Sequence, residues 1–263
     1  MSGGPQPGGR PATGDGWVRT HRDGAVLTVT LDRPAQLNAQ TPATWTALAA
    51  VGAGLPDDVR VVVVRGAGRS FSAGLDRTLV DPRTAGGLGD LARLPAEELQ
   101  ERIRGYQAGF RWLRSPGIVS VAAVQGNAIG AGAQLALACD LRVLTEDAVL
   151  RLPEATLGLV PDLTGTSTLV GLVGYSRALE ICLTGRAVVA AEARAIGLAT
   201  AVVPAGQLHA AVAELVAAIT AAPVGASRET AALVRSAVRN DPEAQDAAER
   251  AAQTRRLAEL AGR

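Results

Sequence analysis

The 263-residue chain contains no lysine, and arginine supplies all 26 of its basic residues. Without lysine, the chain cannot use Schiff-base catalysis, a lysine general base or the phosphate-binding lysine of a Walker-type loop. Histidine is almost as scarce, because His21 and His209 are the only two. This small inventory argues against a histidine metal cluster and against a Ser-His-Asp triad.

Cysteine, aromatic residues and net charge are limited as well. Cys139 and Cys182 are the only cysteines, which does not indicate a disulfide framework and favours a cytoplasmic location. Apolar residues make up 48% of the chain but aromatic residues only 3%, so small side chains are expected to pack closely in a sizeable core. With 26 basic and 25 acidic residues, the chain has no electrostatic footprint for nucleic acid.

Two segments were considered as a signal peptide or a membrane-spanning helix, and neither has the required sequence. Residues 1–16 are rich in glycine and proline and lack the apolar stretch of a signal peptide, so we expect a disordered tail there. Residues 118–139 are mostly apolar, but Gln125, Asn127 and Gln134 interrupt them. The sequence therefore predicts no contact with a membrane.

Hydrophobic patterning predicts an α/β core followed by helices. Strands are predicted at 17–21, 25–31, 59–65, 118–124, 140–145 and 201–203. Helices are predicted at 41–54, 95–113, 133–138, 164–172, 175–184, 190–196, 205–221, 224–239 and 242–261. Because strands and helices alternate in the first part, we expect parallel crossovers. The sequence thus predicts a core over residues 17–200, a helical region over 201–263 and an irregular loop over 81–95.

Two glycine-rich loops, 72–76 and 126–134, each follow a buried strand. In a parallel sheet, ligand sites lie beyond the carboxyl ends of the strands. Small residues let backbone N–H groups approach a ligand oxygen, and a loop that opens a helix favours negative charge. Together the loops could form an oxyanion hole. A dinucleotide-binding loop fits poorly, because Leu135 stands where the third glycine after Gly130 and Gly132 would be.

Five segments follow one another along the chain: residues 31–39 (LDRPAQLNA), 72–76 (SAGLD), 123–140 (AVQGNAIGAGAQLALACD), 152–161 (LPEATLGLVP) and 183–199. In this order and at this spacing they resemble the crotonase (enoyl-CoA hydratase/isomerase) superfamily, and the resemblance extends over about 15–262. It implies an α/β fold of the ClpP/crotonase type, a spiral of repeated ββα units with a C-terminal helical trimerisation region. It also implies a homotrimer or a dimer of trimers.

The resemblance implies roles for individual residues. The backbone N–H groups of Leu75 and Ala131 match the two oxyanion donors, and Glu154 matches a catalytic glutamate. Asp162 stands where the dienoyl-CoA isomerases of the family carry a catalytic aspartate, and Gln134 stands where hydratases have their first catalytic glutamate. Residues matching the family's contacts with the acyl-CoA substrate are Ala39, Ala73, Gly74, Asp76 and Gly130. Coenzyme A is carried by the substrate, and neither a separate cofactor nor a metal is implied.

Gln134 bears most directly on the predicted reaction. Glutamine cannot exchange a proton at ordinary pH, whereas hydration needs water to be activated and the α-carbon to be protonated. A double-bond shift needs only a carboxylate such as Glu154, alone or with Asp162, that removes a proton at one carbon and returns it at another. We therefore expect an acyl-CoA enzyme that stabilises a thioester enolate, with isomerisation favoured and hydration as the alternative.

Other interpretations of these residues stay open. Loss of the first glutamate is also compatible with a non-catalytic acyl-CoA-binding protein. The same fold is also compatible with another enolate reaction, such as a decarboxylating or polyketide-type step. Considered without the resemblance, Glu154 fits a helix-entry or salt-bridge residue and Asp162 fits a helix N-cap. Gln134 fits a packed, hydrogen-bonded residue with no task.

Overall fold

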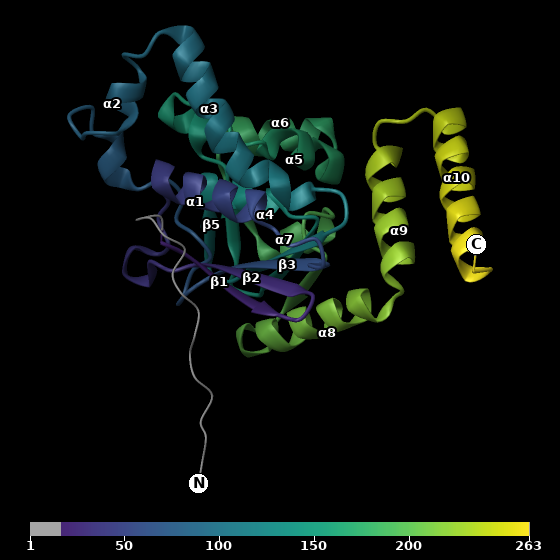
Figure 1. Ribbon diagram of the computed structural model, residues 1–263. Coiled ribbons are helices and arrows are strands. Elements are labelled where there is room, and N and C mark those ends of the chain that lie inside the picture. The colour runs from purple at the N-terminus through teal and green to yellow at the C-terminus, as the bar shows by residue number, and fades with distance from the viewer. Residues whose placement is uncertain (1–16, 263) are drawn as a thin grey trace.

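A six-stranded sheet organises residues 17–262, the part of the chain that the computed structural model describes (Figure 1). Its strands are β1 (Val18–Asp23), β2 (Val26–Leu31), β3 (Val61–Gly66), β4 (Val119–Val124), β6 (Leu141–Thr145) and β9 (Ala201–Val203), in the order β1-β2-β3-β4-β6-β9. β1 and β2 form an antiparallel hairpin, and every later pair is parallel. All the strands predicted from the sequence are present in this sheet. The tail expected at residues 1–16 lies outside the described residues.

The run of valines in β3 explains why helices pack on both faces of the sheet. Val62 and Val64 belong to the main core, together with residues of α1 (Pro42–Ala53), α3 (Ala96–Arg111) and α4 (Ala131–Ala138). Val61 and Val63 point the opposite way, toward α8 (Leu208–Ala221). Figure 1 shows α1, α3 and α4 above the sheet and α8 below it. A strand buried on both faces is a continuous apolar run rather than an alternating one.

A second, three-stranded sheet was not predicted. It contains β5 (Asn127–Ile129), β7 (Val149–Arg151) and β8 (Ala187–Val189), with β5 parallel to β7 and β7 antiparallel to β8. β5 lies inside the segment that we expected to be a loop. Three residues are too few to show a strand period, so only the pairing of distant segments reveals these strands.

The remaining helices follow the prediction, except in the segment 81–95. That segment, expected to be irregular, contains the short helix α2 (Leu88–Leu91). The others are α5 (Gly165–Val173), α6 (Tyr175–Thr184), α7 (Ala190–Ala195), α9 (Val224–Ala237) and α10 (Pro242–Leu260). Short 3₁₀ helices lie at η1 (Pro34–Gln36), η2 (Arg77–Val80), η3 (Trp112–Arg114), η4 (Glu154–Leu157) and η5 (Ala205–Gln207). Thr41 caps α1 as predicted, since its hydroxyl accepts the Thr44 N–H.

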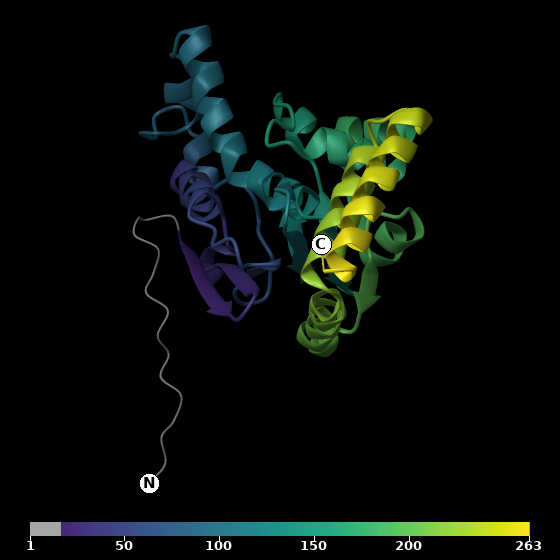
Figure 2. The ribbon, with the colours of Figure 1, turned by 45° about the vertical axis from the view of Figure 1, so that its right-hand side comes forward.

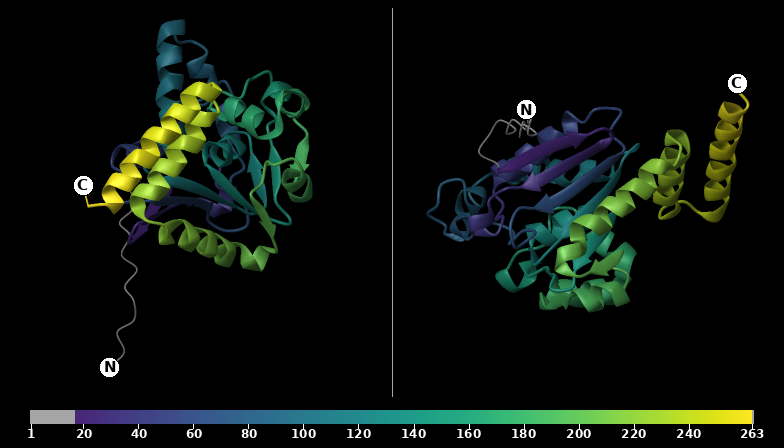
Figure 3. Two further views of the ribbon diagram at one scale, coloured as in Figure 1. Left: turned by 90° about the vertical axis from the view of Figure 1, so that its right-hand side faces the viewer. Right: turned by 90° about the horizontal axis from the view of Figure 1, so that it is seen from below.

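The last two helices form an arm beyond the sheet. β9 and α8 fall within the region 201–263 but pack on the core sheet, whereas α9 and α10 project away from it (Figures 1, 2 and 3). Arg235 on α9 anchors the arm, because its guanidinium pairs with Asp140 at 2.7 Å. Large apolar side chains exposed on the arm are Val224, Val234, Val238, Leu257 and Leu260.

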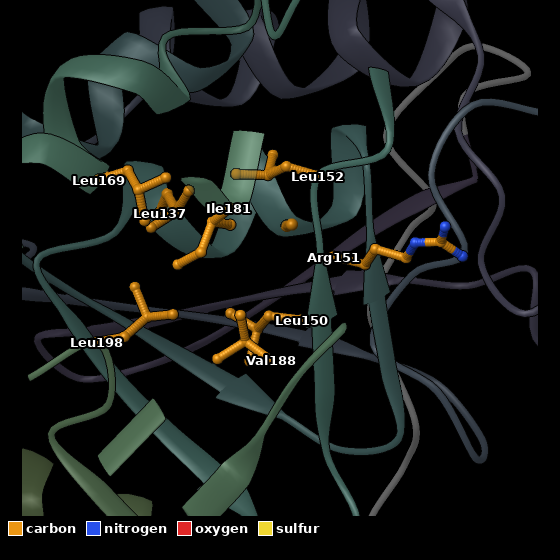
Figure 4. Close-up of a pocket in the computed structure, with 9 residues that line it drawn as sticks. Leu137, Leu150, Arg151, Leu152, Leu169, Ile181, Val188 and Leu198 are labelled. Atoms are coloured by element: carbon orange, nitrogen blue, oxygen red, sulfur yellow. The ribbon is translucent and has the colours of Figure 1, made fainter. Parts of the chain in front are cut away.

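A small apolar pocket lies within the core beside α4 (Figure 4). Leu137 of α4, Leu150 and Val188 of the small sheet, and Ile181 of α6 line it. Arg151 points away from this cluster in Figure 4. The pocket thus belongs to the contact that holds the small sheet against α4 and α6.

Within residues 17–262, no single helix has both the length and the apolarity to cross a bilayer. The helical segments 205–221 and 224–237 are together long and apolar enough, but the chain bends by 107° between them.

Candidate active site

The two glycine-rich loops lie side by side. The Ser72 N–H donates to the Asn127 carbonyl at 2.9 Å, and the Ile129 N–H donates to the Ser72 carbonyl at 3.0 Å. These bonds form a parallel bridge between Ser72 and Ala128 of β5. The second sheet therefore brings together loops that are more than 50 residues apart in the sequence.

Gly74 makes the close approach of these loops possible. Its φ is +83°, a conformation that side chains disfavour. A Cβ at this position would lie 2.3 Å from the Ile129 carbonyl oxygen and 3.4 Å from the Ala131 nitrogen. Gly74 and the beginning of α4 are consequently in direct contact.

The peptide groups on either side of this contact present two N–H groups. The Gly74 carbonyl accepts the Gln40 N–H at 2.7 Å, and the Gly130 carbonyl accepts the Gln134 N–H at 2.9 Å. In a trans peptide the C=O and N–H point in opposite directions, so the N–H groups of Leu75 and Ala131 point away from these partners. Among residues 17–262, neither N–H has an acceptor. Such a pair, one of them at a helix N-terminus, can bind a negatively charged oxygen.

Glu154 lies next to the second of these donors. It follows β7 and opens η4, and its side chain is only 8% exposed. A Cβ on Gly130 would lie 3.4 Å from the Glu154 Oε1. Oε1 accepts the Gln134 amide at 2.9 Å, whereas the buried Oε2 has no hydrogen-bond partner among residues 17–262. Glu154 Oε2 is therefore a buried acceptor that neither a hydrogen bond nor an ion pair satisfies within the described part of the chain.

Gln134 orients this carboxylate. It is 1% exposed, and its Oε1 accepts the N–H groups of Leu163 at 2.8 Å and Gly165 at 3.4 Å. Since two N–H donors face Oε1, the Nε2 must be the atom that faces Glu154. Gln134 is therefore a buried residue whose hydrogen bonds hold it against the Glu154 carboxylate.

Two carboxyl groups in this region have raised pKa values. Burial raises the pKa of Glu154, hydrogen bonds from its own backbone and Gln134 offset part of the rise, and the charge of Asp162 adds to it. Burial also raises the pKa of Asp162. A buried carboxylate with a raised pKa is well suited to exchange protons near neutral pH.

Asp162 is not a helix N-cap. α5 begins at Gly165, and its N-cap is Thr164, which has a left-handed backbone. The carbonyl of Asp162 accepts the Gln107 amide at 2.8 Å, and its carboxyl group is half-buried. Asp162 lies in the same region as Glu154, because the next residue, Leu163, donates its N–H to the Gln134 amide that also binds Glu154.

Of the other predicted site residues, Ala73 contributes through its backbone and Asp76 through its carboxylate. Ala73 donates its N–H to the Leu37 carbonyl at 2.8 Å, and half-buried Ala39 lies next to Gln40, the residue that pairs with the first loop. The Asp76 carboxylate is already bound by Thr78 and Arg33. Burial alone would raise the pKa of Asp76, but the bonds from Thr78 and Arg33 outweigh it and lower the pKa. Asp76 thus stabilises the turn after the first loop.

Sequence reasoning missed the tasks of Asn38 and Gln40. Asn38 has a φ of 54°, and its amide accepts the Arg33 N–H and donates to the carbonyls of Ala67 and Ser70. An asparagine tolerates this left-handed conformation, which is the one signal that its residue type offers. Gln40 is completely buried, and nothing in its sequence context predicts that.

No group of three histidine, cysteine or acidic side chains within residues 17–262 could hold a metal ion.

The comparison with known families decides the assignment. The model of the enoyl-CoA hydratase/isomerase family matches residues 21–261. The chain belongs to this family. The crotonase fold predicted from the five motifs is confirmed, and the chain is an enzyme of the hydratase or isomerase type.

Solved structures and curated relatives in the family are similar over most of the chain. A putative enoyl-CoA hydratase from Thermobifida fusca YX in complex with CoA is 48% identical, with a TM-score of 0.88, over 94% of this chain and 95% of that one. Its complex with acetoacetyl-CoA gives 46% identity and a TM-score of 0.89, over 95% and 100%. A peroxisomal Δ3,5-Δ2,4-dienoyl-CoA isomerase from Arabidopsis thaliana is 31% identical over 70% of this chain and 68% of its own length.

Proposed function

We propose that this member of the hydratase/isomerase family moves a double bond within an enoyl-CoA thioester. The observation that carries the proposal is the pairing of Gln134 with Glu154 at 2.9 Å. Where a hydratase would have a second proton-exchanging carboxylate, this chain has an amide that only donates a hydrogen bond to the first. A single base at this place can shift a double bond, because the reaction removes one proton and returns one.

The thioester carbonyl oxygen would accept hydrogen bonds from the N–H groups of Leu75 and Ala131. These bonds strengthen as the oxygen becomes an enolate, and each is worth about 3 kcal/mol in comparable oxyanion holes. Oε2 of Glu154 would remove a proton from the carbon beside the carbonyl. The electron pair moves into the enolate, and the proton returns at the far end of the conjugated system. The double bond has then moved, with no atom gained or lost.

Asp162 extends the proposal to dienoyl-CoA substrates. A longer conjugated system separates the two carbons that exchange protons, so a second carboxyl group could serve the distant carbon. Burial raises the pKa of Asp162, which makes this carboxyl group a better proton carrier than an exposed aspartate. The similarity to the plant dienoyl-CoA isomerase supports this extension.

Hydration is the second candidate, because the Thermobifida fusca structures carry that description. It would require Glu154 alone to activate water and to supply the proton at the α-carbon, or Asp162 to take one of these roles.

Product analysis distinguishes the candidates. The protein would be incubated with 2-enoyl-, 3-enoyl- and dienoyl-CoA esters in deuterium-enriched water, and the products examined by mass spectrometry and NMR. Isomerisation predicts a moved double bond with deuterium incorporated and no water added. A gain of one water would mean hydration. Binding of every ester without any change would indicate a non-catalytic acyl-CoA-binding protein. A product with neither a moved double bond nor an added water would indicate another enolate reaction.

The assembly of the protein is also a proposal. Exposed apolar residues on α9 and α10 support association with further copies of the chain, as a trimer or a dimer of trimers. Elution at the volume of a monomer in gel filtration would contradict it. The cytoplasmic location stays a prediction.

A further inference from the structure

Gln40 holds the first oxyanion donor from both sides along the backbone. Its N–H donates to the Gly74 carbonyl at 2.7 Å, and its carbonyl accepts the Asp76 N–H at 2.8 Å. Between these two bonds lies Leu75, whose N–H is turned toward the site. Gln40 thus contacts the residues before and after the donor.

The bond to the Gly74 carbonyl sets the direction of the donor. That carbonyl and the Leu75 N–H belong to one rigid peptide group, so fixing the C=O also fixes the N–H on the opposite side. At a φ of +83° with no Cβ, Gly74 does little to prevent this peptide from turning. A hydrogen bond to a peptide carbonyl also polarises its N–H and makes it a stronger donor. The backbone of Gln40 therefore affects both the aim and the strength of the donor.

The side chain of Gln40 connects the same loop to a buried tryptophan. Its Oε1 accepts the Trp45 indole N–H at 2.8 Å, and its Nε2 donates to the Ser72 hydroxyl at 3.0 Å. Ser72 Oγ in turn accepts the Gly74 N–H at 3.2 Å and donates to the Asn38 carbonyl at 2.8 Å. Gln40 and Ser72 are both 0% exposed, so water does not compete for these bonds.

Trp45 gives this network a rigid attachment. It lies on α1, is 7% exposed, and its ring centroid is 4.9 Å from that of Tyr106 and 6.5 Å from that of Phe110 on α3. The indole is thus clamped between two helices that pack closely on each other. The oxyanion loop is consequently attached to α1 by the hydrogen bonds from Ser72 through Gln40 to Trp45, and to α3 by the ring contacts of Trp45.

We propose that Gln40, held by Trp45, is a positioning residue that aims the Leu75 N–H at the substrate carbonyl oxygen. The inference rests on the proposed oxyanion hole but not on which double bond moves. It predicts that weakening the tether reduces stabilisation of the enolate while leaving the binding of the CoA portion unchanged.

The experiment compares three variants. Gln40→Leu removes both side-chain hydrogen bonds, and Trp45→Phe removes the indole N–H but keeps an aromatic ring against Tyr106. Trp112→Phe is the matched control, because Trp112 is 8% exposed and its indole N–H donates to the Gly109 carbonyl at 3.0 Å, in a bond that does not involve the oxyanion loop.

Two readouts are measured for each variant. The first is kcat and KM for the ester that the unchanged enzyme converts. The second is the near-ultraviolet absorbance of the enolate of bound acetoacetyl-CoA at fixed pH, which reports directly on the oxyanion hole. We expect a loss of about tenfold in kcat for Trp45→Phe and up to about a hundredfold for Gln40→Leu, with KM within about twofold. The enolate band should weaken in the same order.

The outcomes separate this inference from the proposed function. If Trp45→Phe retains the kcat and enolate absorbance of Trp112→Phe, the tether has no positioning role, even if Gln40→Leu fails to fold. If the unchanged protein converts no ester but forms the enolate, the proposed reaction is wrong, and the variants still test the tether by absorbance. If it forms no enolate at all, the oxyanion hole and the tether are both overturned.

Discussion

Replacing Gln134 by glutamate should convert Glu154 from a base into an acid. The new carboxylate would lie about 3 Å from the Glu154 Oε1, where the amide nitrogen now lies at 2.9 Å. Two carboxylates at this distance repel each other, so the pair keeps one shared proton up to a higher pH than Glu154 alone would. The N–H groups of Leu163 and Gly165 stabilise the negative charge at position 134, and the proton therefore belongs on Glu154.

The size of the effect follows from the coupling of the two groups. A like charge at this distance raises a carboxyl pKa by roughly one to three units, in addition to the rise that burial already causes in Glu154. Glu154 acts as a base only when ionised, so turnover is present above its pKa and is lost as the pH falls through it. A shift of about two units reduces isomerisation about a hundredfold at a pH below both values. Isomerisation should recover as the pH rises through the new value.

The assay is the pH dependence of kcat/KM for a 3-enoyl-CoA ester in the unchanged enzyme, Gln134→Glu and Gln134→Leu. The leucine variant removes the hydrogen bond to Glu154 without adding a charge, so its acidic limb should move upward by less. With 2-enoyl-CoA, Gln134→Glu should also add water faster than the unchanged enzyme, because it has two groups that exchange protons. An acidic limb that stays in place in Gln134→Glu would refute the assignment of Glu154 as the titrating base.

Three further outcomes are expected. Glu154→Gln should abolish isomerisation, because the amide cannot take a proton. It should also raise the melting temperature at neutral pH. A carboxyl group whose pKa is raised by folding makes the folded protein less stable as the pH rises through that pKa, and an uncharged amide does not have this effect. A melting temperature that falls would contradict the cause given for the shift. Gly74→Ala should lower kcat at least about a hundredfold, because its Cβ would lie 2.3 Å from the Ile129 carbonyl; wild-type turnover would refute the close approach. Arg235→Leu leaves part-buried Asp140 without its ion pair and should cost about 2 kcal/mol in urea unfolding; an unchanged midpoint would show that the pair does not anchor the arm.

Sequence patterns were sufficient for the elements that are long or strongly patterned. The continuous valine run of β3 predicts a strand buried on both faces, and Thr41 with Pro42 predicts the beginning of α1. The five motifs led to the family, which the family model confirms over residues 21–261. In each case the information lies in adjacent residues, so no knowledge of distant contacts is needed.

Short elements were missed for the corresponding reason. β5, β7 and β8 have three residues each, and each is a strand only because a distant segment pairs with it. The helix α2 in the segment 81–95 has four residues and no strong apolar period. Local propensity is too weak over such lengths to compete with tertiary contacts.

The residue types at the site were determined by the sequence alone. The chain has a glutamine at 134, a glutamate at 154, an aspartate at 162 and glycines in two loops, and with the roles implied by the family resemblance these predict isomerisation rather than hydration. Which of these residues contact one another, and through which atoms, was decided by the tertiary structure. Only the fold turns Gln134 so that its amide meets one carboxylate oxygen and leaves the other without a partner among residues 17–262. Only the fold places Gln40 against Gly74, because a hydrogen bond between residues so far apart depends on where the sheet brings each loop, and no local pattern encodes that position.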